Sequence, residues 1–190
     1  ATYNTSLGFQ ALQNLGAGTE NTIIGGLAGD ALTTGAMNVA VGFSALSAED
    51  GDGRNVAIGH QALQALNAGV DAYNIAIGSN AGVLMTTGAE NTIIGGLAGD
   101  ALTTGSYNVA LGFAALTSED GHGRNIAIGY KALYDLNAGA DAYNVAIGFA
   151  AGENVSTGTL NTLIGGLAGD ALTTGVNNVA IGHQALSAED

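Results

Sequence analysis

Residues 55–62 read NVAIGHQA, and they open with a phrase of Asn, two residues, an aliphatic residue and Gly. The phrase occurs eleven times, beginning at Asn4, Asn21, Asn38, Asn55, Asn74, Asn91, Asn108, Asn125, Asn144, Asn161 and Asn178. The spacing between successive Asn is 17, 17, 17 and then 19, and this group of four steps recurs. A fixed short period is typical of a solenoid, in which each repeat is one coil that needs its neighbours to bury its apolar face.

Each phrase predicts a short strand. We count positions in a coil from its Asn, which is position 0. Position +1 is always Thr, Val or Ile, and position +3 is always Leu, Ile or Val. β-Branched residues favour extended backbone, and residues two apart in a strand share a face. We expect the +3 side chain to point into the coil.

Small residues recur at fixed positions in the rest of the coil. Position +4 is Gly and position +7 is Ala in every coil, and an apolar residue follows at +8 or +11 before another Gly. One coil therefore reads as strand, Gly bend, second short strand and Gly turn. Segments such as 61–66 could form helix by propensity, but Gly every few residues argues against sustained helix. The sequence predicts an all-β, parallel β-solenoid of eleven coils, with coil lengths of 17 or 19 set by the Asn spacing.

The recurrent Asn has two interpretations. Its amide can bond the equivalent Asn of the coils above and below in a ladder. It can equally be a turn residue that tolerates left-handed backbone. Both interpretations are structural.

An apolar stripe predicts self-association. Position +2, which we expect to face outward, is apolar in most coils, as at Ile23, Ala40 and Leu163. A continuous apolar stripe along a rod usually marks an interface. We expect parallel copies of the chain to associate, as a homotrimer.

Four consecutive coils recur together as a longer super-repeat. Residues 21–35 and 91–105 are identical, and 161–175 differ only at Leu163. We divide one continuous array, residues 1–190, into units 4–73, 74–143 and a partial unit 144–190. Because both ends lie inside a repeat, we interpret the chain as a window of a longer fibre.

Composition excludes several classes of partner. The net charge is -13, with only Arg54, Arg124 and Lys131 as fixed cations, so we expect no nucleic acid or anionic membrane partner. No apolar run is long enough to cross a membrane. The chain has no Cys, and its three His form no recognisable catalytic set with other residues. We expect no enzyme, and we assign no catalytic, cofactor-binding or metal residue.

One acidic loop is the best candidate for a cation. Glu49, Asp50 and Asp52 lie in a Gly-rich turn, and clustered carboxylates can supply the oxygen ligands that calcium prefers. The copy of this loop, residues 119–123, has His122 in place of the third carboxylate. A solvated acidic loop is the alternative, and we favour it.

Two charge pairs and a column of rings follow from stacking the coils. Arg54 and Asp71 share a position in adjacent coils, as do Arg124 and Asp141, and we expect weak ion pairs there. Several rings share position +5, namely Phe9, Phe43, Phe113, Tyr130 and Phe149. They could bind glycan, although such rings more often fill an interface.

The motifs in residues 55–62 and 108–116 resemble repeats of two fibrous families. They are similar to the head repeats of trimeric autotransporter adhesins, and more similar to tandem repeats in tail fibres of tailed bacteriophages. The resemblance covers all eleven coils. It implies a left-handed parallel β-roll in a homotrimer, with an extracellular or virion location.

We therefore expect a structural shaft that spaces and presents a distal receptor-binding tip. The alternative is an adhesin surface that grips glycan or matrix along the rod. Ice binding is a third candidate, but its flat Thr array is broken here, because paired Thr such as 33–34 and 103–104 do not occur on every coil.

Overall fold

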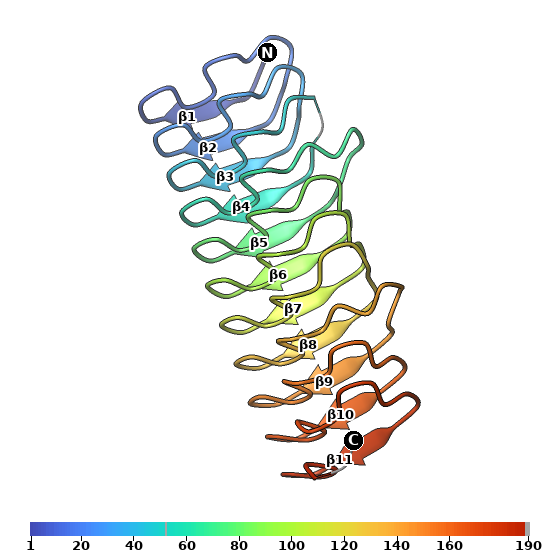
Figure 1. Cartoon of the computed structure of the whole chain (residues 1–190). Helices are drawn as coiled ribbons and strands as arrows, with labels where there is room; N and C mark the ends of the chain where they lie inside the picture. The colour runs from blue at the N-terminus through green and yellow to red at the C-terminus, as the bar shows by residue number, and fades with distance from the viewer. Residues whose placement is uncertain (52, 189–190) are drawn as a thin grey trace.

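The computed structural model describes residues 1–51 and 53–188, which form a stack of coils running from one end of the molecule to the other (Figure 1). Each coil contributes one three-residue strand: β1 (Thr5–Leu7), β2 (Thr22–Ile24), β3 (Val39–Val41), β4 (Val56–Ile58), β5 (Ile75–Ile77), β6 (Thr92–Ile94), β7 (Val109–Leu111), β8 (Ile126–Ile128), β9 (Val145–Ile147), β10 (Thr162–Ile164) and β11 (Val179–Ile181). The strands pair in chain order in one parallel sheet. The described residues include no helix, so the predicted all-β parallel solenoid is confirmed.

Strand register follows the repeated phrase. Val39 lies opposite Val56, and Val56 lies opposite Ile75, so each strand residue meets its equivalent in the next coil. The sheet continues without a break from β4 to β5 and from β8 to β9, across the boundaries of the predicted units at residues 73–74 and 143–144. The division into units 4–73, 74–143 and 144–190 stays a prediction from sequence.

Two details of the predicted coil are wrong. The described residues of each coil form only one strand, and turns and bends replace the second strand that we expected. The facing of the strand is also inverted. The middle residue, at +2, points inward: Ile23, Ala40 and Ala57 are fully buried, whereas Ile24 and Ile58 are exposed.

The inversion has a steric cause. The interior of each coil is narrow, because Ala at +7 also lies inside it and is fully buried throughout the middle coils, as at Ala98 and Ala115. Only one strand residue in three faces inward, so the aliphatic pair at +1 and +3 is left outside. The core consists of columns of side chains at +2, +7, +8 and +11 that run along the rod.

The Gly at +4 allows the coils to approach closely. Gly112 has φ +141°, and a Cβ placed on it would lie 2.3 Å from the carbonyl oxygen of Gly129 in the next coil. No side chain fits at that distance, so the contact between coils requires Gly.

The Asn ladder is present. Asn108 Oδ1 accepts a hydrogen bond of 3.0 Å from the backbone N–H of Asn125, and Asn91 Oδ1 accepts one of 2.9 Å from that of Asn108. Asn91 Nδ2 also donates to the carbonyl oxygen of Gly105 at the end of its own coil, at 2.9 Å. These Asn side chains are buried, so the ladder satisfies polar groups inside the rod.

Candidate functional site

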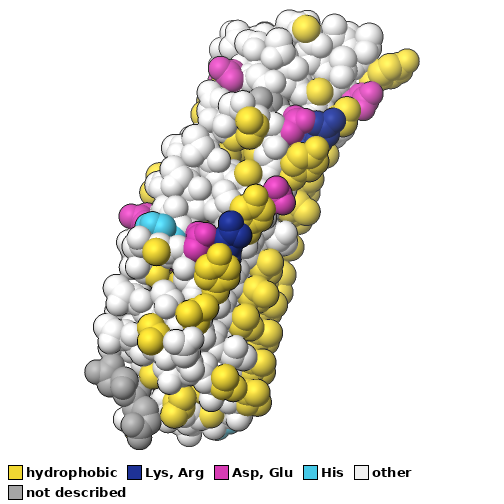
Figure 2. Space-filling model, turned by 90° about the vertical axis from the view of Figure 1, so that its right-hand side faces the viewer, with side chains coloured by type: hydrophobic (Ala, Val, Ile, Leu, Met, Phe, Trp, Pro, Cys, Tyr) yellow, Lys and Arg dark blue, Asp and Glu magenta, His cyan; other side chains and the backbone are white. Residues whose placement is uncertain are grey.

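The first candidate surface is the outer face of the sheet, formed by the +1 and +3 side chains of β1–β11. We call it the outer sheet face. Away from the two ends of the rod, the exposed aliphatic residues of this face have 36–39% of their surface accessible to solvent. They are Ile24, Ile58, Ile75, Leu111, Ile126 and Ile147. Figure 2 shows hydrophobic side chains in a band along one edge of the molecule. The strand fold turns two aliphatic or Thr columns outward in every coil, which is a wider apolar surface than the single +2 stripe that we predicted.

Aromatic columns flank the outer sheet face. On one side, Tyr73, Tyr107 and Tyr143 occupy the position before the Asn and are about half exposed, at 50–54%. On the other side lie the +5 rings, and these stack between coils: Phe113 on Tyr130 at 5.8 Å and Tyr130 on Phe149 at 5.2 Å between ring centroids. Rings and aliphatic side chains together make a broad apolar surface on one side of the rod.

The predicted ion pairs form at the edge of this surface. Arg54 pairs with Asp71, and Arg124 Nε lies 2.6 Å from Asp141 Oδ2. Figure 2 shows positive and negative side chains adjacent at two levels beside the hydrophobic band. A further pair, Lys131 Nζ to Glu153 Oε1 at 3.0 Å, raises the pKa of Lys131.

The acidic loop that we named as a calcium candidate, and expected to be solvated, divides between core and solvent. Glu49 is fully buried and Asp50 is exposed, while Asp52 lies outside the described residues. The expectation of a solvated loop is therefore wrong for Glu49, and the calcium alternative is not tested. The burial of Glu49 could have been predicted, because at +11 the other coils carry Leu, Met or Val, except for Glu119 and Glu189.

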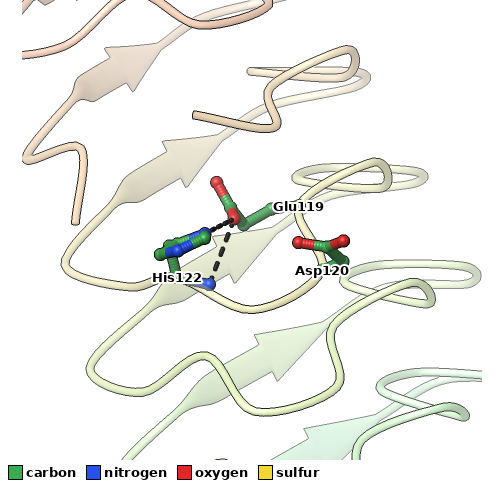
Figure 3. Close-up of side chains that lie close together, drawn as sticks. All are labelled: Glu119, Asp120 and His122. Atoms are coloured by element: carbon green, nitrogen blue, oxygen red, sulfur yellow. Dashed lines mark hydrogen bonds and ion pairs between the residues drawn. The ribbon is translucent and has the colours of Figure 1, made fainter. Parts of the chain in front are cut away.

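The second copy of the loop brings three potential metal ligands together. One ligand atom each of Glu119, Asp120 and His122 lies within 4.8 Å of the others, and among the described residues these form the one such group of His, Asp and Glu. Figure 3 shows His122 and Asp120 on either side of Glu119. The sequence pointed to the other copy because it has three carboxylates.

Burial dominates the electrostatics of this cluster. It raises the pKa of the Glu119 carboxyl group, and the N–H of His122, which donates to Glu119 Oε1 at 3.2 Å, offsets part of the rise. His122 Nδ1 lies 3.4 Å from the same oxygen. The other two histidines, His60 and His183, are exposed, and His60 stacks on Phe43 at 5.8 Å between ring centroids.

No family model, curated protein or solved structure matches the chain. The similarity to tail-fibre and adhesin repeats therefore stays a prediction. Because helix is absent from residues 1–51 and 53–188, they include no helix long and apolar enough to span a membrane.

Proposed function

We propose that this chain is a shaft segment of an extracellular or virion fibre. In this proposal, the coils, with their two lengths of 17 and 19, wind left-handed, and parallel copies associate as a homotrimer. The shaft spaces and presents a receptor-binding tip carried elsewhere. Catalysis plays no part in it.

The outer sheet face is the observation that carries the proposal. Its +3 column is aliphatic in all eleven strands, and its +1 column is Val, Ile or Thr, so a partner of the same repeat could match it along the whole rod. Apolar surface of this extent on a single chain usually marks an interface. The opposite arrangement, an isolated rod, would leave Leu111 and Ile147 in water without compensation.

The net charge of the chain bears on how two copies could associate. With a net charge of -13, copies repel at long range, and association must come from apolar burial. The two Arg of the chain both form ion pairs beside the outer sheet face, and exposed Glu20 and Glu90 occupy the same flanking position in two other coils, so the charge beside this face is negative. We therefore expect assembly to tighten as salt concentration rises.

The test is the mass of the particle in solution. Sedimentation equilibrium should give three times the chain mass for the native sequence. The double substitution Leu111→Lys and Ile147→Lys should give monomers, because it places ammonium groups in the apolar contact. Ala140→Lys is the matched control, since Ala140 is exposed in a loop away from the strands, and it should remain trimeric. A native chain that stays monomeric would contradict the proposal.

Binding of glycan along the rod is a second candidate, favoured by the stacked rings. Phe113, Tyr130 and Phe149 are 49%, 43% and 60% exposed, and exposed rings can pack against sugar faces. Tyr130→Ser is the matched variant, because Ser79 occupies the same position in another coil. Binding to a glycan array that this substitution abolishes would favour the adhesin interpretation.

Ice binding is left out of the proposal. The Oγ1 atoms of Thr33 and Thr103 donate to carbonyl oxygens of the next coil, at Asp50 (2.9 Å) and Asp120 (2.6 Å). These hydroxyl donors are engaged within the rod rather than offered to water.

A further inference from the structure

The +11 core column contains a buried carboxylate, Glu119, whose charge and hydrogen-bonding capacity are only partly compensated by its surroundings. Glu119 takes the position that Leu102 and Leu136 hold in the neighbouring coils, and all three residues are fully buried. Glu119 Oε1 accepts from the N–H of His122, and Oε2 is buried with no hydrogen bond of good geometry among the described residues, although the backbone N–H of Ala138 is close enough to lower the pKa of the carboxyl group. Burying a carboxylate in this way is unfavourable unless a proton or a cation compensates it.

Two further ligands meet Glu119 from the solvent side. His122 Nδ1 is itself a buried atom without a hydrogen bond in the described part of the chain, and it faces Glu119 Oε1 at 3.4 Å. Asp120 is exposed, and its carboxylate completes the group within 4.8 Å (Figure 3). Because the His122 side chain is 33% exposed, an ion can reach the group from water.

We propose that Glu119, Asp120 and His122 bind one divalent metal ion of the zinc class, with water completing the coordination. Zinc accepts imidazole nitrogen together with carboxylate oxygen at about 2.0–2.2 Å, so two tetrahedral ligands lie about 3.4 Å apart. The observed separation of His122 Nδ1 and Glu119 Oε1 is 3.4 Å. Calcium instead takes six to eight oxygen ligands, and His is a poor substitute for them.

Two simpler arrangements compete with a metal. A proton on Glu119 would remove the buried charge, and a protonated His122 would form an ion pair with it. Neither arrangement uses Asp120, and neither retains zinc. Metal binding therefore separates the three arrangements directly.

The chain provides its own control variants. Residues 49–52 read EDGD where residues 119–122 read EDGH, so His122→Asp creates a loop that the protein already contains. Glu119→Leu installs the residue found at 102 and 136. His60→Tyr tests surface histidine, because Tyr130 occupies the equivalent position four coils later.

The experiment is isothermal titration of the full chain with Zn²⁺, after removal of metal with a chelator. We expect one ion per chain. Loss of a residue that only supports a ligand weakens metal binding by about 10–100-fold. Glu119→Leu removes a ligand, and His122→Asp replaces the imidazole with a shorter carboxylate, so each should weaken zinc binding at least about tenfold, while His60→Tyr binds as the native chain does. Co²⁺ in place of Zn²⁺ should give visible absorption bands of a tetrahedral site, lost in the same two variants.

Several results would overturn the proposal. Native chain that takes no zinc would leave a proton or an ion pair as the compensation for Glu119. Zinc binding of native strength in His122→Asp would show that the His122 imidazole is not a ligand. Zinc binding that disappears in His60→Tyr would assign the ion to surface histidine. Calcium binding as tight as zinc would contradict the chosen class of metal. None of these outcomes depends on whether the rod is a trimer, so the proposed function is tested separately.

Discussion

Two neighbouring coils have the same backbone path but exchange the positions of their large and small core residues. The coil that starts at Asn91 places Ile93 at +2 and Gly99 at +8, whereas the coil that starts at Asn108 places Ala110 at +2 and Leu116 at +8. All four residues are buried. A Cβ on Gly99 would lie 2.8 Å from Leu102 Cδ1 and 3.3 Å from Ile93 Cδ1, so a side chain at +8 would compete for space with the +2 and +11 residues of its own coil.

The comparison shows that a large residue can occupy either position of a coil. The coil that starts at Asn74 has a small residue at both, Ala76 and Gly82, and there side chains of the two adjacent coils, Leu63 and Ile93, lie next to Gly82. The same exchange appears in other coils, with Ile23 and Gly29 in one and Ala127 and Leu133 in another. Volume-conserving exchanges are the best tolerated changes in protein cores. The backbone can stay the same because both kinds of coil share the Asn at position 0 and the Gly at +4.

The largest effect should come from changing what both coils share. Gly112→Ala should cost at least about 4 kcal/mol in the free energy of unfolding, because the new Cβ would meet the backbone oxygen of Gly129 at 2.3 Å. No side-chain rotation relieves a clash with backbone, so the two coils must separate. Denaturant titration followed by circular dichroism measures the loss.

Gly139→Ala is the control for the backbone conformation alone. Gly139 also has positive φ, at +70°, but nothing lies within 4 Å of a Cβ placed there. This variant should lose only about 1 kcal/mol, the cost of a left-handed residue with a side chain. Equal losses in both variants would mean that close contact between coils is not the reason for Gly at +4.

Exchanging volume within one coil should have the next largest effect. Ile93→Ala leaves a cavity and should cost about 3 kcal/mol. Adding Gly99→Leu rebuilds the arrangement of Ala110 and Leu116, and it should recover at least half of the loss. A double-mutant cycle on the free energy of unfolding tests this. Strictly additive effects would show that the two positions do not share one space.

The coils also differ at +11, where Leu102 is replaced by Glu119 in the next coil. In buffer without metal, Glu119→Leu should raise the free energy of unfolding by about 1–3 kcal/mol, because it removes a buried carboxylate with an unsatisfied oxygen. Leu102→Glu is the reciprocal variant and should destabilise the rod. If Glu119→Leu gives no gain, the carboxylate is already compensated without a metal.

The parts of this fold that depend on repetition could be predicted from the sequence. The eleven Asn fix the stacking, so the parallel sheet, the Asn ladder and the two Arg–Asp pairs all follow from placing equivalent residues in adjacent coils. The period alone determines these contacts, whatever the shape of one coil.

The repeat period does not predict which face of each strand is buried, or that Glu49 and Glu119 are buried. A strand of three residues has too few alternations to show which face is inside, and aliphatic residues at +1 and +3 suggested the wrong one. Glu119 was assigned to an acidic loop with Asp120, although adjacent residues point to opposite sides here, one buried and one exposed. Comparing the +11 residues of all coils would have separated the two.

The smallest effect should come from the ion pair at the edge of the outer sheet face. Arg124→Ala removes the contact with Asp141, in which the two side chains are 42% and 43% exposed, and a stacking contact 4.9 Å from the centre of the Tyr107 ring. Exposed ion pairs contribute about 0–1 kcal/mol, and an exposed cation–π contact about 0.5–1 kcal/mol. The free energy of unfolding, measured by heat or denaturant, should therefore fall by about 1 kcal/mol, and by less in high salt. Because the core of this coil does not depend on Arg124, a loss as large as that of Ile93→Ala would mean that the edge of the sheet, and not the volume inside it, holds adjacent coils together.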